Sequence, residues 1–259
     1  MILKHKGINI FYTETGKGSA IVLLHGFLES SKIWDTFVPK LAKKNRVVCI
    51  DLLGHGNTEC LGYIHTMELM AEAVEAVLKH LRIRKSTFIG HSMGGYVALA
   101  FAEKNPDNVK GLCLLNSTAS ADTPEKKQNR ARGIIAVKQN HKTFIRHAVS
   151  NLFIPENHKK FATQIKQLIK DCQKTPLQGI VAALEGMKIR EDREVLLHFS
   201  PYKKMMIIGK NDPILNYNNL ISQTKDTNVN VVVLDGGHMS FIENESACLA
   251  NIMHFIENN

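Results

Sequence analysis

The sequence contains no hydrophobic run that approaches the ~18 residues of a membrane-spanning helix. Its first residues, Met1 to Gly7, lack the apolar core of a signal peptide. The five cysteines are odd in number and show no disulfide-like spacing, so we expect reduced and mostly buried thiols. These absences predict a cytoplasmic protein without a membrane span.

Signals for metals, cofactors and nucleic acids are missing as well. No C-x-x-C pair and no histidine-rich spacing suggests a metal site. The net charge is +9, but no known nucleic-acid-binding motif accompanies it. The chain also has no internal repeat and no low-complexity stretch. We therefore expect no metal, no cofactor and no nucleic-acid partner.

What the sequence does contain is the alternation of an α/β protein. Hydrophobic residues make up 44% and charged residues 22% of its 259 residues, which is ordinary for a soluble globular protein. Strands that alternate with helices predict a mostly parallel sheet with helices on both faces. The apolar runs that predict strands are 2–6, 8–13, 20–24, 47–51, 86–89, 111–116, 204–209 and 229–234.

Helices are predicted by apolar residues at helical spacing. The clearest one covers residues 66–81, with Thr66 as its N-cap, and others are expected at 214–223 and 241–256. A helix is also expected around residues 33–41, where Pro39 is awkward and should end or kink it.

The alternation stops between residues 117 and 200. This segment has no convincing buried strand and reads as several helices, two of which start at Thr123-Pro124 and Thr175-Pro176. It carries 15 lysines and arginines against 8 aspartates and glutamates, or +7, whereas the rest of the chain carries +2. We therefore predict a core of residues 1–116 and 201–259, interrupted by a basic helical insertion at 117–200.

A strand–turn–helix passage surrounds Ser92, which lies in the sequence G-H-S-M-G-G at residues 90–95. In this context the pattern G-x-S-x-G holds a serine hydroxyl on a sharp turn, at a helix start where free N–H groups favour negative charge. Glycine suits positions 90 and 94 because side chains there would collide with the backbone. The motif alone is equally compatible with a glycine-rich turn and an idle serine.

A serine nucleophile needs a base, and the base needs an acid that orients it. His238 follows the strand at 229–234 and Asp212 follows the strand at 204–209, so both should lie at the same sheet edge as Ser92. Without this context, His238 reads as an ordinary loop histidine and Asp212 as the cap of the following helix. We predict Ser92, His238 and Asp212 as the catalytic residues.

Two other positions compete for the role of the acid. Asp235 is close in sequence, but it lies only three residues before His238 and should reach the ring less naturally. The end of the strand at 111–116 is a further position for an acid, and this chain has Asn116 there. Both comparisons favour Asp212.

Acyl transfer passes through an oxyanion that backbone N–H groups stabilise. One donor is expected at Met93, at the start of the helix. The second is expected at Phe27, in the loop after the strand at 20–24. Phe27 also has a plainer interpretation, as a buried aromatic residue in a βα turn.

Taken together, these residues resemble the α/β-hydrolase fold superfamily, in its branch of small serine hydrolases with a helical cap. The resemblance implies a mostly parallel, eight-stranded sheet, a cap at residues 117–200 and the order nucleophile, acid, histidine. Leu53 departs from the family's usual proline, and Ser92 disfavours the relatives with an aspartate nucleophile. The motifs that carry the resemblance are L-H-G-F at 24–27, D-L-L-G-H-G-N-T at 51–58, G-H-S-M-G-G at 90–95, G-K-N-D at 209–212 and G-H at 237–238.

Three classes of function remain open on this basis. The chain is expected to be a hydrolase of carboxylic esters or thioesters that forms an acyl-enzyme at Ser92. A carbon–carbon hydrolase or lyase of the same fold is the alternative, and the intact set of Ser92, Asp212 and His238 counts against a non-catalytic ligand-binding member. Its partner should be a small acyl substrate. The basic insertion is either a solvated surface or a source of attraction for an anionic substrate or an acidic carrier protein. In the second case, Lys126, Lys127, Arg130 and Arg132 are the candidate residues.

Overall fold

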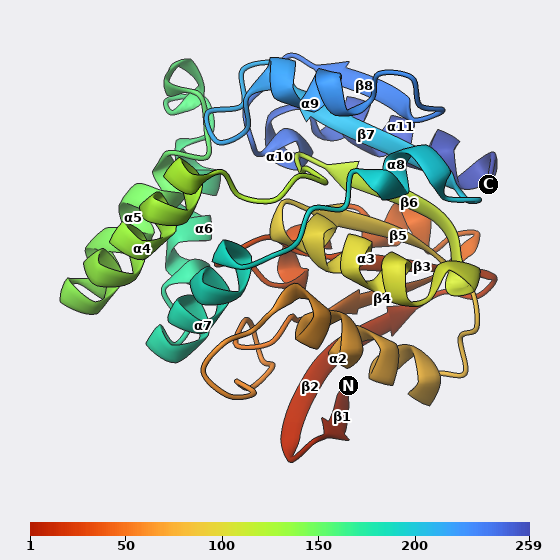
Figure 1. Ribbon diagram of the computed structural model, residues 1–259, viewed down its shortest axis with the longest axis horizontal. Helices are drawn as coiled ribbons and strands as arrows, with labels where there is room; N and C mark the ends of the chain where they lie inside the picture. The colour runs from red at the N-terminus through yellow and green to blue at the C-terminus, as the bar shows by residue number, and fades with distance from the viewer.

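The computed structural model describes residues 1–259 and contains one eight-stranded sheet in the order β1-β2-β4-β3-β5-β6-β7-β8 (Figure 1). β1 and β2 are antiparallel to their neighbours, and the other six strands run parallel. Every expected strand is present. The strands are β1 Ile2–His5, β2 Ile8–Thr15, β3 Ser19–Leu24, β4 Asn45–Ile50, β5 Ser86–His91, β6 Val109–Leu115, β7 Lys203–Gly209 and β8 Asn230–Leu234.

The helices form two sets: those that alternate with the strands along the chain, and those that lie between β6 and β7 in the sequence. The first set contains η1 Ser31–Trp34, α1 Val38–Leu41, α2 Met67–His80, α3 Met93–Lys104, η2 Pro106–Asn108, α9 Tyr217–Gln223, α10 Ser240–Glu243 and α11 Glu245–Glu257. The second set contains α4 Pro124–Gln139, α5 His141–Ser150, η3 Pro155–Asn157, α6 Ala162–Cys172, α7 Leu177–Lys188 and α8 Val195–Phe199.

The sheet is buried on both faces, and successive residues of β3 show how. Val22 and Leu24 belong to a hydrophobic cluster with α2, α3 and α9, whereas Ile21 and Leu23 belong to a second cluster with η1, α1, α10 and α11. Side chains alternate between the faces of a strand, so a continuous apolar run is what a doubly covered strand requires. The expected layering of helices on both faces is confirmed.

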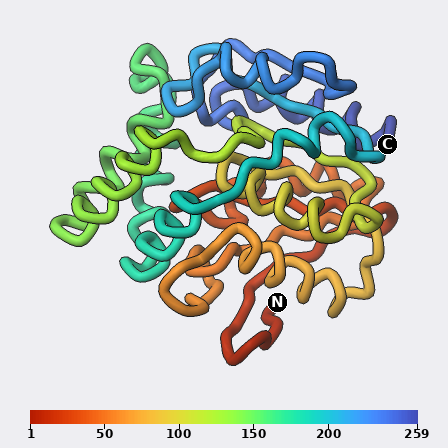
Figure 2. The backbone as a smooth tube through the Cα atoms, viewed as in Figure 1, coloured from red at the N-terminus to blue at the C-terminus, as the bar shows by residue number.

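The helices α4 to α7 gather outside one end of the sheet and cover neither face (Figure 1). Two connections join them to the core, and they run side by side in the backbone trace (Figure 2). The N–H of Arg193 donates to the carbonyl of Ala119 at 2.8 Å, and the N–H of Ala121 donates to Asp192 at 3.0 Å. Residues 117–200 therefore leave and re-enter the core at one place.

Two predicted helix starts are confirmed by their capping bonds. The hydroxyl of Thr66 accepts from the N–H of Leu69 at 3.1 Å, and the hydroxyl of Thr123 accepts from the N–H of Lys126 at 3.2 Å. Pro124 follows Thr123 in the first turn of α4, where a missing N–H costs nothing.

Three expected helices have different bounds. The one expected around 33–41 is split into η1 and the single turn α1, because Pro39 fits only in a first turn. The helix expected at 214–223 begins only at Tyr217, since Asp212 Oδ1 accepts from two amides and holds the preceding residues in a turn. The helix expected at 241–256 is divided at Asn244 into α10 and α11.

All five cysteines are free, and four of them are buried, as expected; Cys60 is half-buried. Burial raises the pKa of the Cys49 thiol to about 12, so that thiol is inert at neutral pH. No helix combines the length and the hydrophobicity that a membrane span requires.

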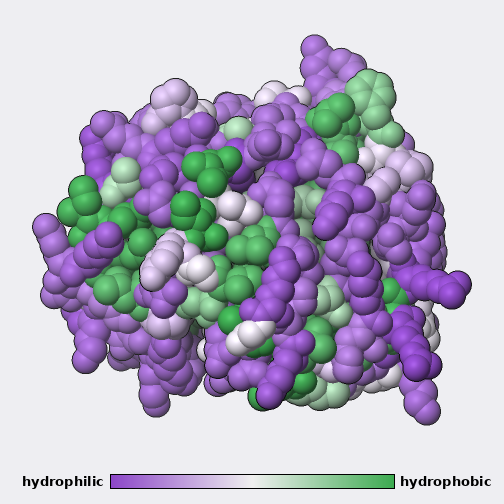
Figure 3. Space-filling view, turned by 60° about the horizontal axis from the view of Figure 1, so that its bottom comes forward, coloured by the Kyte–Doolittle hydropathy of each residue, from purple (hydrophilic) through white to green (hydrophobic).

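One face of the molecule shows hydrophobic residues gathered toward the side where α4 to α7 lie (Figure 3). Ile135 of α4 and Leu177 of α7 are 60% and 41% exposed, although single exposed apolar residues are ordinary. The rest of that face is largely hydrophilic, which matches the basic composition of the chain.

Candidate active site

Ser92 lies on a sharp turn between β5 and α3, at the carboxyl edge of the parallel strands. Its backbone has φ 49° and ψ −115°, a conformation that is strained for a residue with a side chain. A Cβ atom at Gly90 would overlap the backbone of Gly94, and one at Gly94 would overlap the carbonyl of Leu24. Only glycine fits these two positions, as the sequence pattern predicts.

The structure brings Ser92, His238 and Asp212 together. Ser92 Oγ lies 2.8 Å from His238 Nε2, and His238 Nδ1 lies 2.7 Å from Asp212 Oδ2. Both are hydrogen-bond distances. The arrangement lets the hydroxyl pass its proton to the imidazole while the carboxylate holds the other side of the ring.

The side chain of Asp212 is fully buried and accepts four hydrogen bonds. Oδ1 accepts from the backbone N–H groups of Ile214 and Leu215, and Oδ2 accepts from Asn116 Nδ2 at 3.2 Å besides His238. Burial acts to raise the pKa of Asp212, but the charge of His238 and these hydrogen bonds outweigh it, so the pKa is lowered. Asp212 is therefore ionised at neutral pH.

The competing acid, Asp235, is exposed just after β8 and makes no hydrogen bond to the His238 ring. The residues predicted as oxyanion donors lie next to two of the strands. Met93 is the first residue of α3, and Phe27 lies in the loop after β3. No carbonyl or side chain of the protein accepts from the backbone N–H of either residue, so both donors are free.

In the sequence, Asn116 was notable only because the position lacks an acid. In the structure it also contacts the proposed catalytic residues. Its backbone has φ 43°, and its Nδ2 group donates to Asp212 and to the carbonyl of Gly237 at 3.1 Å. The signal for it was a polar residue directly after a buried strand. Asn116 links the acid to the loop that carries His238.

His91 and Glu29 form a second buried group that sequence reasoning missed. His91 Nδ1 lies 2.9 Å from Glu29 Oε2, and His91 Nε2 lies 3.1 Å from the carbonyl oxygen of His238. Glu29 Oε2 also accepts from the N–H of Gly26 at 2.6 Å. The available signal was an acidic residue in the apolar loop after His25, and a histidine directly before Ser92.

The basic residues proposed for anion capture are only partly free. Arg130 is paired with Asp122, which is buried and also binds Arg190 at 2.5 Å. Arg130 is therefore held in an ion pair, although one carboxylate shared by two guanidinium groups leaves the cluster with a net charge of +1. Lys127 and Arg132 are exposed, and Lys126 is half-buried.

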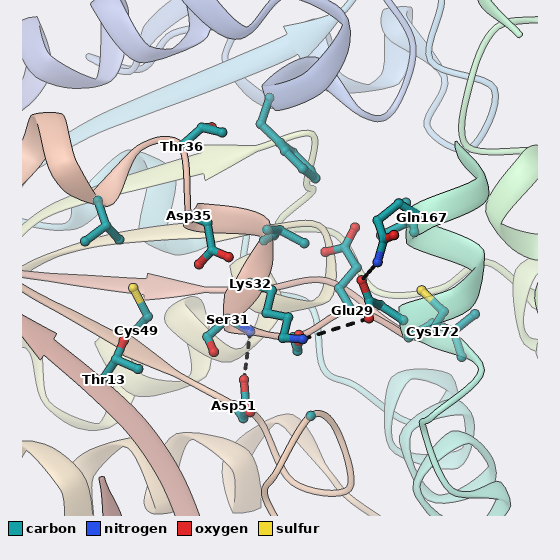
Figure 4. Close-up of a pocket in the computed structure, with 18 of the residues that line it drawn as sticks. Thr13, Glu29, Ser31, Lys32, Asp35, Thr36, Cys49, Asp51, Gln167 and Cys172 are labelled. Atoms are coloured by element: carbon teal, nitrogen blue, oxygen red, sulfur yellow. Dashed lines mark hydrogen bonds and ion pairs between the residues drawn. The ribbon is translucent and has the colours of Figure 1, made fainter. Parts of the chain in front are cut away.

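A cavity of about 980 Å³ is lined by none of Ser92, Asp212 and His238 (Figure 4). It lies between β2, β4, η1 and α6, and its wall includes Thr13 and Cys49. Lys32 on its wall lies 3.9 Å from Asp171. Glu29 lines this cavity as well and is the link between it and His91.

A family model described as "alpha/beta hydrolase fold" matches residues 19–245. Among solved structures, a thermophilic esterase from Thermogutta terrifontis superimposes with a TM-score of 0.92 at 28% identity, covering 99% of this chain and 96% of the esterase. An enol-lactonase from Burkholderia xenovorans gives a TM-score of 0.91 at 21% identity over 99% of this chain and 100% of that one, and so shows the fold alone.

Among curated proteins, the rat bifunctional epoxide hydrolase 2 is 35% identical over 46% of this chain and 22% of its own length. The acetyltransferase component of an acetoin-cleaving system from Pseudomonas putida is 29% identical over 87% of this chain and 60% of its own. The chain thus spans less than two thirds of either relative. Because the family model covers most of the chain and the fold agrees throughout, the chain belongs to the alpha/beta hydrolase fold family and is an enzyme.

Proposed function

We propose that the chain is a serine hydrolase that cleaves carboxylic esters or thioesters through an acyl-enzyme on Ser92. One observation carries the proposal: the chain of hydrogen bonds from Ser92 Oγ through His238 to Asp212, at 2.8 and 2.7 Å. A hydroxyl is a poor nucleophile unless a base accepts its proton, and this arrangement supplies the base and orients it.

In the first half of the reaction, His238 Nε2 takes the Ser92 proton as Oγ attacks the substrate carbonyl. The ionised Asp212 stabilises the imidazolium that forms. The carbonyl oxygen becomes an oxyanion, to which we assign the N–H groups of Phe27 and Met93 as donors, because neither has an acceptor within the protein. The leaving alcohol or thiol then departs with the proton from His238, and the acyl group stays on Ser92.

In the second half, water replaces the leaving group. His238 takes a proton from water as the water oxygen attacks the acyl carbonyl, and the same two N–H groups stabilise the second oxyanion. Collapse of this intermediate releases the carboxylic acid, and His238 returns the proton to Ser92. The chemistry requires no cofactor.

We also propose that residues 117–200 act as a cap over the core formed by 1–116 and 201–259. The gathering of α4 to α7 at one end of the sheet supports this division (Figure 1). The cap would select a small acyl substrate. Any attraction for an anionic substrate or an acidic carrier protein would depend mainly on Lys126, Lys127 and Arg132, because the guanidinium of Arg130 is held in an ion pair with the buried Asp122.

Carbon–carbon cleavage by the same residues is the alternative. A meta-cleavage product hydrolase from Pseudomonas fluorescens shares the fold with a TM-score of 0.81 at 17% identity, over 97% of this chain and 95% of that one, a likeness of fold only. The esterase from T. terrifontis is more similar in sequence, which favours ester cleavage.

The test is a substrate panel combined with labelling. Esters of short and long acyl chains, thioesters and cleavable diketones are offered to the wild type, to Ser92→Ala and to His238→Ala. We expect hydrolysis of an ester or thioester and a loss of ~10⁴-fold or more in either variant. A fluorophosphonate probe should label the wild type once, on Ser92.

Ser222→Ala is the matched control, because Ser222 is an exposed serine of α9 and should keep both activity and labelling. Labelling that survives in Ser92→Ala would overturn the assignment of the nucleophile. Turnover of the diketones alone would replace ester cleavage with carbon–carbon cleavage.

A further inference from the structure

Three loops that carry the proposed catalytic groups meet at the buried pair His91–Glu29. The Glu29 carboxylate binds the loop that presents Phe27, His91 directly precedes Ser92, and the His91 ring binds the main chain of His238. Both side chains are only 1% exposed. Neither residue is within the Ser92–His238–Asp212 chain of hydrogen bonds.

The hydrogen bonds around His91 and Glu29 match those of an ion pair. The carbonyl oxygen of His238 can only accept, so His91 Nε2 carries a proton. Glu29 Oε2 already accepts from the N–H of Gly26, and a carboxylate in that position also takes the proton donated by His91 Nδ1. With Glu29 ionised, both ring nitrogens donate and His91 is an imidazolium.

Glu29 closes the loop before it from two sides. Its N–H donates to the carbonyl of Gly26 at 3.3 Å, and its carboxylate accepts from the N–H of the same residue at 2.6 Å. Phe27 lies inside this closed turn, and Leu28 has φ 68°. A Cβ atom at position 26 would lie 2.7 Å from Glu29 Oε2 and 2.8 Å from His91 Nδ1. Glu29 thus binds both backbone groups of Gly26, the residue that precedes Phe27.

We propose that the His91–Glu29 ion pair is a positioning device for the reaction, which sets the Phe27 oxyanion donor and the His238 loop relative to Ser92. The inference rests on the function proposed above. Without the pair, the hydrogen bonds of Ser92, His238 and Asp212 would still form. The Phe27 N–H and the His238 ring would no longer be held at a fixed distance from each other. A shift of about 1 Å between such groups typically costs about 10²-fold in rate.

The test uses Glu29→Gln, which keeps the shape of the side chain and removes its charge, together with His91→Gln and the double variant. Active enzyme is counted by fluorophosphonate labelling, and kcat and KM are measured for an ester that the wild type hydrolyses. Affinity for a trifluoromethyl ketone, which forms a tetrahedral oxyanion on Ser92, is measured in parallel. Glu14→Gln, which breaks the ion pair with Arg46 between β2 and β4, is the control.

We expect kcat per labelled site to fall about 10- to 100-fold in Glu29→Gln, with little change in KM and a parallel loss of affinity for the ketone. The double variant should lose about as much as either single variant, because the two residues act as one unit. Glu14→Gln should keep its kcat.

The inference is overturned if kcat per labelled site in Glu29→Gln stays within about twofold of the wild type, if only KM changes, or if the two single effects multiply. A lower melting temperature with unchanged kcat would show that the pair is merely structural and would also overturn it. If the wild type is not labelled on Ser92, the proposed function fails first and the inference fails with it.

Discussion

At the scale of single residues, Asp212 and Asp235 are two carboxylates near one histidine with opposite surroundings. Asp212 is buried with four donors, whereas Asp235 is exposed. Only Asp212 can fix the tautomer that leaves His238 Nε2 free to accept a proton. An asparagine at position 212 would keep the shape of the side chain without stabilising the imidazolium.

We therefore expect Asp212→Asn to lower kcat by about 10⁴-fold, while Asp235→Asn stays within about twofold of the wild type. Steady-state kinetics on one ester, with both proteins checked for an unchanged circular dichroism spectrum, gives the comparison. A larger loss in Asp235→Asn than in Asp212→Asn would mean that the acid has been assigned to the wrong residue.

The His91–Glu29 pair makes stability depend on pH in a defined window. Burial acts to lower the pKa of His91, but Glu29 outweighs it and raises that pKa above 6.5; burial acts to raise the pKa of Glu29, but His91 outweighs it and lowers that pKa below 4.5. The contribution of His91 to folding stability is fully present below pH 6.5 and is lost as the pH rises through its raised pKa. That of Glu29 is full above pH 4.5 and is lost as the pH falls through its lowered pKa.

The stabilisation by the pair should thus be greatest between about pH 4.5 and 6.5. In Glu29→Gln the buried His91 loses its counter-ion and resists protonation, so the melting temperature of the variant should lie further below the wild type at pH 6 than at pH 9, by several degrees. His25, His238 and Asp212 also face the pair, but they are present in both proteins and largely cancel in the difference. A difference in melting temperature between the wild type and Glu29→Gln that does not change with pH would contradict the ionic form of the pair.

At the scale of secondary-structure elements, α4 carries the basic residues that could meet an anionic substrate. Arg130 is occupied by Asp122, so Lys126, Lys127 and Arg132 remain. Lowering the salt from physiological strength to 0.01 M lengthens the Debye length from ~8 to ~30 Å, which extends the reach of these charges.

We expect kcat/KM for a carboxylate-bearing ester to fall several-fold as salt rises through this range, while kcat/KM for a neutral ester of similar size stays level. The change should shrink in the variant that replaces Lys126, Lys127 and Arg132 by glutamine. If salt changes kcat/KM equally for the two esters, the basic surface of α4 serves only to keep the protein soluble.

The elements also show what could be read from sequence and what could not. The strands and the helices with clear caps, such as α2 after Thr66 and α4 after Thr123, follow from local patterns of side chains and were predicted closely. The break between η1 and α1 was not predicted closely, because the apolar residues of this segment have helical spacing. Only the position of Pro39 decides that the helix is broken. The late start of α9 depends on hydrogen bonds to the Asp212 carboxylate, which no local pattern reports.

The site divides in the same way. Ser92, Asp212 and His238 could be proposed because each follows a strand, and parallel strands bring their carboxyl ends to one edge. Asn116 and the His91–Glu29 pair were not proposed, because no motif marks these residues and their roles depend on which buried groups they contact. Those contacts exist only in the folded chain.

At the scale of the whole molecule, the insertion of residues 117–200 between neighbouring strands has a consequence for the order of folding. Gly111 of β6 pairs with Lys203 of β7, 92 positions later, and closing so long a flexible loop costs about 4 kcal/mol of chain entropy. If the helical segment forms first, the bonds that join residues 119–121 to 190–193 hold its two ends together and remove most of that cost. The segment then serves as a template that delivers β7 to the edge of β6. Asp212 and His238 reach Ser92 only after that delivery, so the proposed catalytic residues come together only when the part of the chain after residue 202 has docked.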